Sequence, residues 1–138
     1  MNPWRRALPG SGRLPDDLRA TLTAEGLVLL DEELTGSITY RNYRAPGQYS
    51  GWKKEATSGA IALTPGRLVV WTGRSKHIDV ALDHPLRAAI EVSLDGPGRV
   101  RFAYEAQAFG PSRSGHVEVR LRTQHAARIA ELLTPTGQ

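Results

Sequence analysis

The feature that most constrains the fold of this chain is a series of short segments in which apolar and polar residues alternate, closed by one amphipathic segment. The clearest part of the series is Gly59–Trp71, and the amphipathic segment is Thr123–Leu133. A period of two residues is typical of half-buried β-strands, whereas apolar residues three and four positions apart indicate a helix. The pattern therefore predicts a mainly β fold that ends in one helix.

We expect about seven antiparallel strands between residues 27 and 122, spaced roughly ten residues apart. The first strand is long or is a bent pair, and Gly36 is expected to mark a bend or bulge within it. Two further strands are expected at Ala60–Leu63 and Leu68–Trp71. The residues expected to share one face of their strands are Val28, Leu30, Leu34, Ile38, Tyr40, Ile61, Ile78, Val80, Leu82, Ile90, Val92, Leu94, Val100, Phe102, Tyr104, Ala106, Ala108, Val117, Val119 and Leu121.

Turns are expected where proline and glycine interrupt the alternation. Thr64–Arg67 has these residues in the positions that a type II turn prefers. Further turns are expected at Gly73–Lys76 and Asp95–Gly98, and loops at residues 44–54 and 110–115. The segment of residues 44–54 is expected to be a long loop.

Two helices are expected, at residues 15–25 and 123–134. The first carries leucines at a spacing of four residues, follows a proline, has two aspartates in its first turn and precedes a glycine. A threonine caps the second. Its expected inward face consists of Ala126, Ile129, Ala130 and Leu133.

A length of 138 residues suits one domain, so we expect a disordered tail at residues 1–14 and a single domain at residues 15–134. The absence of cysteine excludes disulfides and thiolate metal sites. The N-terminal residues lack the apolar stretch of a signal peptide, and no apolar run approaches the ~20 residues that span a bilayer. A cytoplasmic protein is therefore expected, with peripheral attachment to the inner face of the membrane as the alternative.

The positive charge of the chain is local. Of 18 basic residues, seven lie in residues 1–14 and 41–54, which contain no acidic residue. The rest of the chain carries eleven basic and fourteen acidic residues, so a globally basic surface is excluded, whereas a local basic patch is not. In the second of these segments, tyrosine and tryptophan interleave with the cations, a pattern suited to phosphate contacts and stacking. The alternative is that Tyr40 packs inward and the rest is a solvated loop.

The side chains that commonly carry catalysis do not form a constellation. His77 and Asp79 are expected on the exposed face of a strand, and two ligands do not make a metal site. His84, His116 and His125 are expected in a turn, on an outward strand face and at a helix boundary. We therefore expect no catalytic residue, no metal and no cofactor. An enzyme with an internal barrel cavity remains only as the alternative that a deep polar pocket would support.

The strand Gly59–Thr64 running into Arg67–Trp71, together with the strand count, the loop order and the C-terminal helix, resembles the pleckstrin-homology-like fold. The resemblance is to small bacterial domains akin to GRAM domains and covers roughly residues 27–134. It implies a barrel of about seven antiparallel strands in two roughly orthogonal sheets, with strands in residues 27–122 and a capping C-terminal helix. The short helix at residues 15–25 is an addition to that pattern.

The resemblance also implies a ligand-binding region, because in this family the loop between the first two strands often binds phosphoinositide headgroups. The loops between the third and fourth and between the sixth and seventh strands lie beside it. The acidic Glu55 after two lysines departs from the family's basic pattern. The candidate binding residues are Arg41, Tyr43, Arg44, Trp52, Lys53, Lys54, Arg74, Lys76 and Arg113.

Two functions follow from these expectations. The first is a non-catalytic interaction module that binds a protein partner or itself through its sheet surface and loops. The alternative is a module that binds an anionic ligand, a phospholipid headgroup or single-stranded nucleic acid, through residues 41–54. Binding of the second kind must weaken as salt rises.

Overall fold

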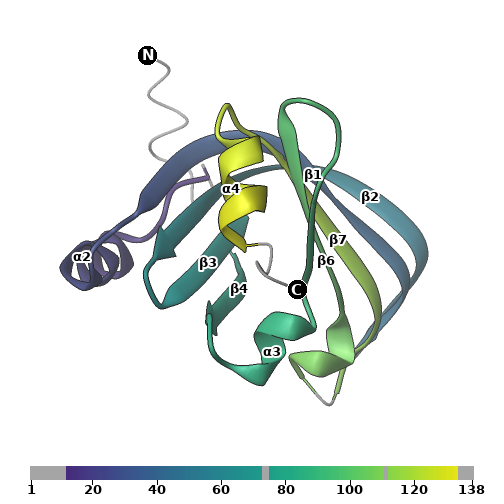
Figure 1. The fold of residues 1–138 in the computed structure, drawn as a ribbon. Helices are drawn as coiled ribbons and strands as arrows, with labels where there is room; N and C mark the ends of the chain where they lie inside the picture. The colour runs from purple at the N-terminus through teal and green to yellow at the C-terminus, as the bar shows by residue number, and fades with distance from the viewer. Residues whose placement is uncertain (1–11, 73–74, 111, 134–138) are drawn as a thin grey trace. The chain divides into compact units, whose positions relative to one another are not determined.

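The computed structural model describes residues 12–72, 75–110 and 112–133 (Figure 1). Hydrogen bonds connect its strands in the order β4-β3-β2-β1-β7-β6-β5. The expectation of a mainly β fold with seven antiparallel strands and a C-terminal helix is confirmed within these residues. In chain order the elements are α2 (Asp16–Glu25), β1 (Leu29–Ala45), β2 (Gln48–Thr64), β3 (Arg67–Thr72), β4 (Ser75–Ala81), α3 (Pro85–Ala88), β5 (Glu91–Leu94), β6 (Arg99–Glu105), the 3-10 helix η1 (Ala106–Ala108), β7 (Ser114–Arg122) and α4 (Ala126–Leu133).

The chain forms two compact units, and the long strands β1 and β2 contribute to both. The first unit comprises Met1–Thr35 and Thr57–Arg87, and the second comprises Gly36–Ala56 and Ala88–Gln138. The prediction of a single domain at residues 15–134 stays a prediction. Each unit is described by itself below.

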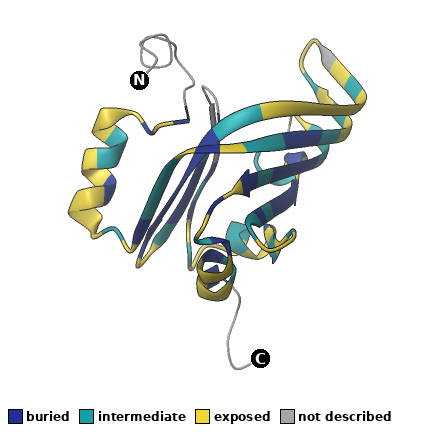
Figure 2. Cartoon of the chain, turned by 90° about the horizontal axis from the view of Figure 1, so that it is seen from above, coloured by how far each residue is buried: buried dark blue, intermediate teal, exposed yellow. Residues whose placement is uncertain are grey.

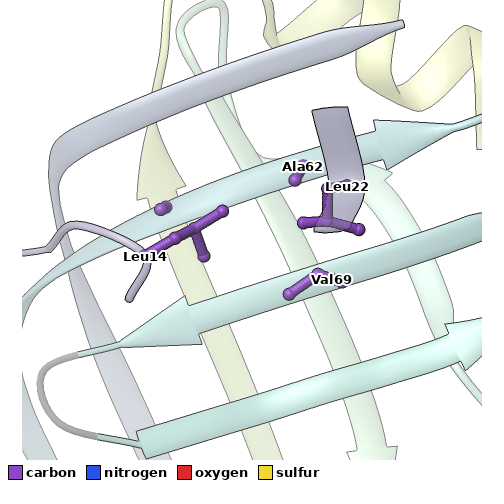
Figure 3. Close-up of a cluster of buried hydrophobic side chains, with 5 residues drawn as sticks. Leu14, Leu22, Ala62 and Val69 are labelled. Atoms are coloured by element: carbon purple, nitrogen blue, oxygen red, sulfur yellow. The ribbon is translucent and has the colours of Figure 1, made fainter. Parts of the chain in front are cut away.

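In the first unit, α2 packs on strands β2 and β3 through a small apolar cluster (Figure 3). Leu22 of the helix is fully buried with Leu14, Ala62 and Val69. Pro15 precedes the helix, and Gly26 ends it with a φ of 95°. Burial of a leucine stabilises a fold by roughly 1.5–3 kcal/mol, which fixes a helix too short to be stable alone. The helix begins one residue later than predicted.

The residues just before α2 contact β1 and lie against β2, and the predicted disordered tail at residues 1–14 stays a prediction. The backbone N–H of Leu14 donates to the Glu32 carboxylate at 2.9 Å, and the N–H of Glu33 donates to the carbonyl of Gly12 at 2.8 Å. A Cβ on Gly12 would lie 2.8 Å from the Cβ of Ser58, so glycine lets this segment lie against the strand. Residues 1–11 lie outside the described residues.

At the start of β1, the residues that face the core are not the ones that the alternation predicted. Val28 is 44% exposed, whereas Leu29 is buried. Glu33 has a φ of 59°, and its N–H donates to Gly12 instead of continuing a regular ladder, so the alternation changes phase there. The predicted inward residues Leu34 and Ile38, after this point, are buried.

Gly36 allows close packing of β1 against β7, and the bend or bulge expected there stays a prediction. It pairs with Leu121 of β7, and a Cβ on Gly36 would overlap the carbonyl oxygen of Arg120. The residues of β1 with positive φ are Glu33 and Asn42. The glycine therefore allows β1 and β7 to approach each other in the second unit.

The predicted long loop at residues 44–54 is wrong, because these residues belong to a β-hairpin. Strand β1 continues to Ala45 and β2 begins at Gln48, with Pro46 and Gly47 as the turn. Gly47 has a φ of 73°, the left-handed conformation that glycine adopts without strain. Proline and glycine thus form a tight turn between two strands, and the strands continue on either side of it.

The other turns also differ in detail. Residues 65–66 connect β2 to β3 as expected, but Gly66 does not have the positive φ of a type II turn. Ser75 and Lys76 of the next predicted turn belong to β4, and residues 73–74 lie outside the described residues. The predicted loop at residues 110–115 ends at Ser114, where β7 begins.

In the second unit, strands β6 and β7 supply the most deeply buried residues. Phe102, Val119 and Leu121 are fully buried, as predicted. The predicted inward residues Ala106 and Ala108 form η1 and do not extend the strand. Leu94 on β5 is 49% exposed, contrary to the prediction.

Helix α4 packs against β5 and β6. Thr123 accepts a hydrogen bond from the backbone N–H of His125 at 3.0 Å, the local capping contact that its position predicted. The helix proper begins at Ala126, later than the predicted residue 123. Ala126, Ile129 and Leu133 are buried, whereas the fourth predicted residue, Ala130, is partly exposed.

We expect Gly36→Ala to destabilise the protein by about 1–3 kcal/mol, because the added methyl group must displace the backbone of β7. Denaturant unfolding measures this change. Gly66→Ala is the matched control, since Gly66 lacks a positive φ and nothing lies within 4 Å of its Cβ position. Equal stabilities of the two variants would contradict the close approach at Gly36.

Candidate functional site

The candidate site is the end of the β1–β2 hairpin, residues 41–56, which we call the hairpin arm. Every residue from Gly51 to Ala56 is exposed. Trp52 is 63% exposed and Tyr49 is 58% exposed, and Figure 2 shows the end of the hairpin coloured mainly as exposed. Since successive side chains of a strand point to opposite faces, exposure of consecutive residues means that both faces of this segment of β2 contact water.

The cations of the hairpin arm are partly engaged within it. The guanidinium of Arg44 lies 4.7 Å from the centroid of the Tyr49 ring, a cation–π contact between the two strands. Lys53 pairs with Glu55 at 3.6 Å, and both side chains are nearly half exposed. Such exposed pairs contribute about 0–1 kcal/mol, so Lys53 remains available to a partner. Lys54 is exposed on the opposite face of β2.

Tyr43 anchors the arm and does not project from it. Asn42 has a φ of 50°, and the register between β1 and β7 shifts between Arg41 and Arg44. This bulge brings Tyr43 to the face of Tyr40, where the two ring centroids lie 4.9 Å apart. Tyr43 is half-buried, so its role as a ligand-binding residue is less supported than that of Trp52.

Glycine on β7 permits this bulge. Gly115 has a φ of 105°, and a Cβ on it would lie 2.6 Å from the Cα of Tyr43 and overlap the backbone of Asn42. The positive φ and the close approach both favour glycine at this position. The base of the hairpin arm is therefore fixed against β7 by backbone packing.

Two tyrosine hydroxyls at this base are neutral at ordinary pH. Burial, followed by the negative charge of Glu55, raises the pKa of Tyr40 to about 12. Burial also raises the pKa of Tyr104, whose ring contacts Phe109 with centroids 4.9 Å apart. The positive charge of Arg113 lowers the pKa of both hydroxyls and so opposes these effects.

The structure therefore unites most, but not all, of the residues predicted to bind a ligand. Arg113 is exposed and precedes Ser114, which is paired with Arg44 in the β1–β7 ladder. Arg74 lies outside the described residues, and for Lys76 only the backbone in β4 is described. Those two assignments stay predictions. The residues brought together on the hairpin arm are Arg41, Arg44, Trp52, Lys53 and Lys54.

Beside the arm lies a charged cluster that the sequence reasoning missed. Its centre is Glu118 of β7, which is only 2% exposed. The carboxylate lies 2.9 Å from Arg101, 2.6 Å from Arg120 and 2.8 Å from the ring of His116. Arg41, at the start of the hairpin arm, lies 3.5 Å from the same carboxylate, so β1, β6 and β7 all contribute cations to it.

The electrostatics of this cluster keep Glu118 charged. Burial, the largest single influence, raises the pKa of Glu118, but hydrogen bonds from Arg101, His116 and Arg120 together lower it to about 2. Removing one partner of a buried ion pair is costly because the remaining charge loses its compensation. Arg41 is therefore a half-exposed residue with a structural partner, not a fully free ligand-binding cation.

His116 bridges two carboxylates. Its Nδ1 lies 2.6 Å from Glu105 and its Nε2 lies 2.8 Å from Glu118. The hydrogen bond to Glu105, and then that to Glu118, raises the pKa of His116, while burial opposes the change. With both ring nitrogens engaged, His116 is a cross-link between β6 and β7, and no cluster of three or more metal-ligating side chains occurs among the described residues.

In the first unit, Asp79 has a structural partner and does not simply face solvent. Its two carboxylate oxygens each accept a hydrogen bond from Arg67 at 2.7 Å. Arg67 also reaches Glu25 at the end of α2, at 2.8 Å. The side chain of His77 is not described, so a shared role of His77 and Asp79 gains no support.

We expect His116→Gln to cost stability mainly in acid. Because the pKa of His116 is raised by folding, its contribution is fully present below the ordinary imidazole pKa of about 6.5 and is lost as the pH rises through the raised value. The variant should lose about 1 kcal/mol at about pH 5 and much less at about pH 9. Urea unfolding at the two pH values measures this, and a loss independent of pH would contradict the bridge.

Comparisons with protein-family models, with curated proteins and with solved structures found no match for this chain. None of the helices in the described ranges is long and apolar enough to cross a membrane. The interpretation of the hairpin arm therefore depends on the geometry of its own residues.

Proposed function

We propose that this protein is a non-catalytic interaction module and that the hairpin arm is the surface with which it binds a partner protein. The observation that carries the proposal is the exposure of Trp52 and Tyr49, at 63% and 58%, on a strand fixed at its base. Aromatic side chains and arginine are enriched at protein interfaces and dominate their binding energy. A rigid strand presents these side chains at low entropic cost.

As a finer description, we propose that the fold is a pleckstrin-homology-like barrel of two roughly orthogonal sheets, akin to the bacterial GRAM-like domains. The strand order β4-β3-β2-β1-β7-β6-β5 supports this, since it consists of two meanders, β1 to β4 and β5 to β7, joined by the pairing of β1 with β7. The amphipathic C-terminal helix on β5 and β6 supports it too. The cytoplasmic location and the association with a partner or a second copy are part of the same proposal.

The state of the titratable groups supports a non-catalytic role. General acid–base catalysis needs a group that is free to exchange a proton with a substrate. Both ring nitrogens of His116 are engaged by carboxylates, and Glu118 is surrounded by cations with a pKa of about 2. These residues are held in a structural cluster.

A second candidate function is the binding of an anionic ligand, such as a phospholipid headgroup or single-stranded nucleic acid, by the same arm. The specific observation in its favour is the exposed Trp52 directly followed by Lys53 and Lys54. A tryptophan supplies a stacking face or an interfacial anchor, and the lysines supply phosphate contacts.

We expect Tyr49→Ala combined with Trp52→Ala to reduce the recovery of a partner from cell extract at least about tenfold, because hot-spot aromatics each contribute ~2 kcal/mol or more. Affinity capture with the purified protein, followed by quantification of the captured species, measures this. Leu94→Ala with Leu132→Ala removes two comparably exposed apolar side chains elsewhere and should retain the partner. Equal recovery with both double variants would contradict the role of the arm.

For the anionic-ligand candidate, Lys53→Ala with Lys54→Ala should weaken binding to anionic liposomes or oligonucleotides, and the remaining binding should fall as salt rises. The measurement is titration at two ionic strengths. Arg122→Ala with Arg128→Ala removes the same charge from exposed positions outside the arm and should have little effect. Absence of binding at low salt would eliminate this candidate.

A further inference from the structure

Strand β2 has an open edge along the hairpin arm. Its ladder with β3 runs from Gly59 to Thr64, and these residues belong to the first unit. In the second unit, Gln48–Ala56 has β1 as its only neighbouring strand among the described residues. Within the part of the chain that the structure describes, one row of backbone N–H and C=O groups along this segment therefore lacks a strand partner, and the side chains of the segment are mostly exposed.

Open edges of this kind are normally short or blocked, because they pair readily with other chains. The segment Gln48–Ala56 is longer than the typical strand of about 5–6 residues. It contains no proline, and it carries two large exposed aromatic side chains. A Cβ on Gly51 would meet only the side chain of Tyr49, at 3.5 Å, so the packing of this chain does not require glycine there.

We propose that Gln48–Ala56 binds an extended, acidic segment of a partner protein by β-strand addition. The inference rests on the proposed function and specifies its binding mode and the chemistry of the partner. The backbone edge supplies hydrogen bonds that do not depend on sequence, and alternate side chains supply selectivity. Trp52 and Tyr49 lie on opposite faces of the strand, so each contacts a different set of the incoming side chains.

The charge of the arm identifies the partner segment as acidic. Residues 41–56 carry four cations and one carboxylate, Glu55, which is paired with Lys53. Lys53 and Lys54 follow each other and therefore present a cation on each face of β2. Acidic side chains at successive positions of an added strand thus meet a cation on either face.

The same charges disfavour a second copy of this chain as the occupant. Antiparallel self-pairing about Trp52 would bring the lysines of both strands into one short ladder, and like charges across a strand pair are destabilising. Lysine on an exposed edge is itself a common means of preventing self-association.

The hairpin arm is also poorly suited to binding a single phosphate group. Phosphate sites gather several cations on one group, whereas Lys53 and Lys54 diverge to opposite faces and Arg44 covers the Tyr49 ring. A strand edge with cations on both faces suits an extended chain that carries acidic side chains on both of its own faces.

The test uses the full chain and a synthetic ten-residue peptide in which pairs of consecutive glutamates alternate with pairs of consecutive valines, so that glutamates lie on both faces of the added strand. We expect binding, and we expect hydrogen exchange followed by NMR to show slowed exchange at alternate amides of Gln48–Ala56, because every second N–H of an edge strand points outward. A lysine–valine peptide should bind at least about tenfold more weakly. Absence of binding of the acidic peptide at low salt would overturn the proposal.

Two controls separate strand addition from simple charge attraction. An acidic peptide with proline in place of every valine keeps its charge but loses N–H groups of the ladder, and it should bind at least about tenfold more weakly. Lys53→Glu with Lys54→Glu in the protein should weaken binding of the all-L glutamate–valine peptide by about tenfold or more, whereas Arg122→Glu with Arg128→Glu should leave its affinity unchanged. Equal binding of the proline peptide, or protection confined to residues outside Gln48–Ala56, would overturn strand addition.

The outcome can be separated from that of the proposed function. If the aromatic double variant loses its captured partner but the peptide protects no alternate amides, the arm is a binding surface and strand addition is wrong. If the captured partner is unaffected by that variant, the proposed function itself fails. Preferential binding of an oligonucleotide or an anionic vesicle over the acidic peptide, or dimerisation through β2, would contradict the acidic segment as occupant.

Discussion

The second unit depends on one buried carboxylate held by cations from three strands. Glu118 is 2% exposed and contacts Arg101 from β6 and Arg41 from β1, besides His116 and Arg120 on its own strand. A charge in that position is tolerated only because its desolvation is offset by several ion pairs at once. The cluster ties the base of the hairpin arm to the sheet, opposite the apolar face formed by residues such as Val119.

That base allows the arm to be both ordered and exposed. On the apolar side, Tyr40 and Tyr43 pack ring to ring, and Gly115 admits the bulge at Asn42. On the polar side, Arg41 is held by Glu118. Beyond this base the strands continue with little burial, so Trp52 is presented on a strand and not on a loop. The proposed binding surface is thus a consequence of how the base is fixed.

The elements with regular periodicity could be predicted from the sequence, because each follows from residues close together in the chain. Leu22 of α2, Val119 of β7 and Ile129 of α4 are fully buried where their periods of four, two and three to four residues indicate. The prediction failed where a local irregularity changed the phase. The positive φ of Glu33 explains why Leu29 is buried and Val28 is exposed.

The candidate site was predicted by residue type and missed in conformation. Pro46 and Gly47 indicated a loop, although the same pair makes a tight turn between two strands. Glu118 was not identified because its partners come from distant segments: Arg41 is 77 positions away, and only the registers of β1 and β6 with β7 bring them together. Alternating polar residues on β7 were the one available signal, and alone they indicate only a solvated face.

The central claim is that Gln48–Ala56 is an ordered edge strand with one open side. Site-resolved amide hydrogen exchange of the free protein tests it most directly. We expect an alternating pattern, in which amides that point to β1 are protected and the amides between them exchange rapidly. Rapid exchange at every residue of the segment would show a loop, and protection at every residue would show an edge already covered, so either result would contradict the account.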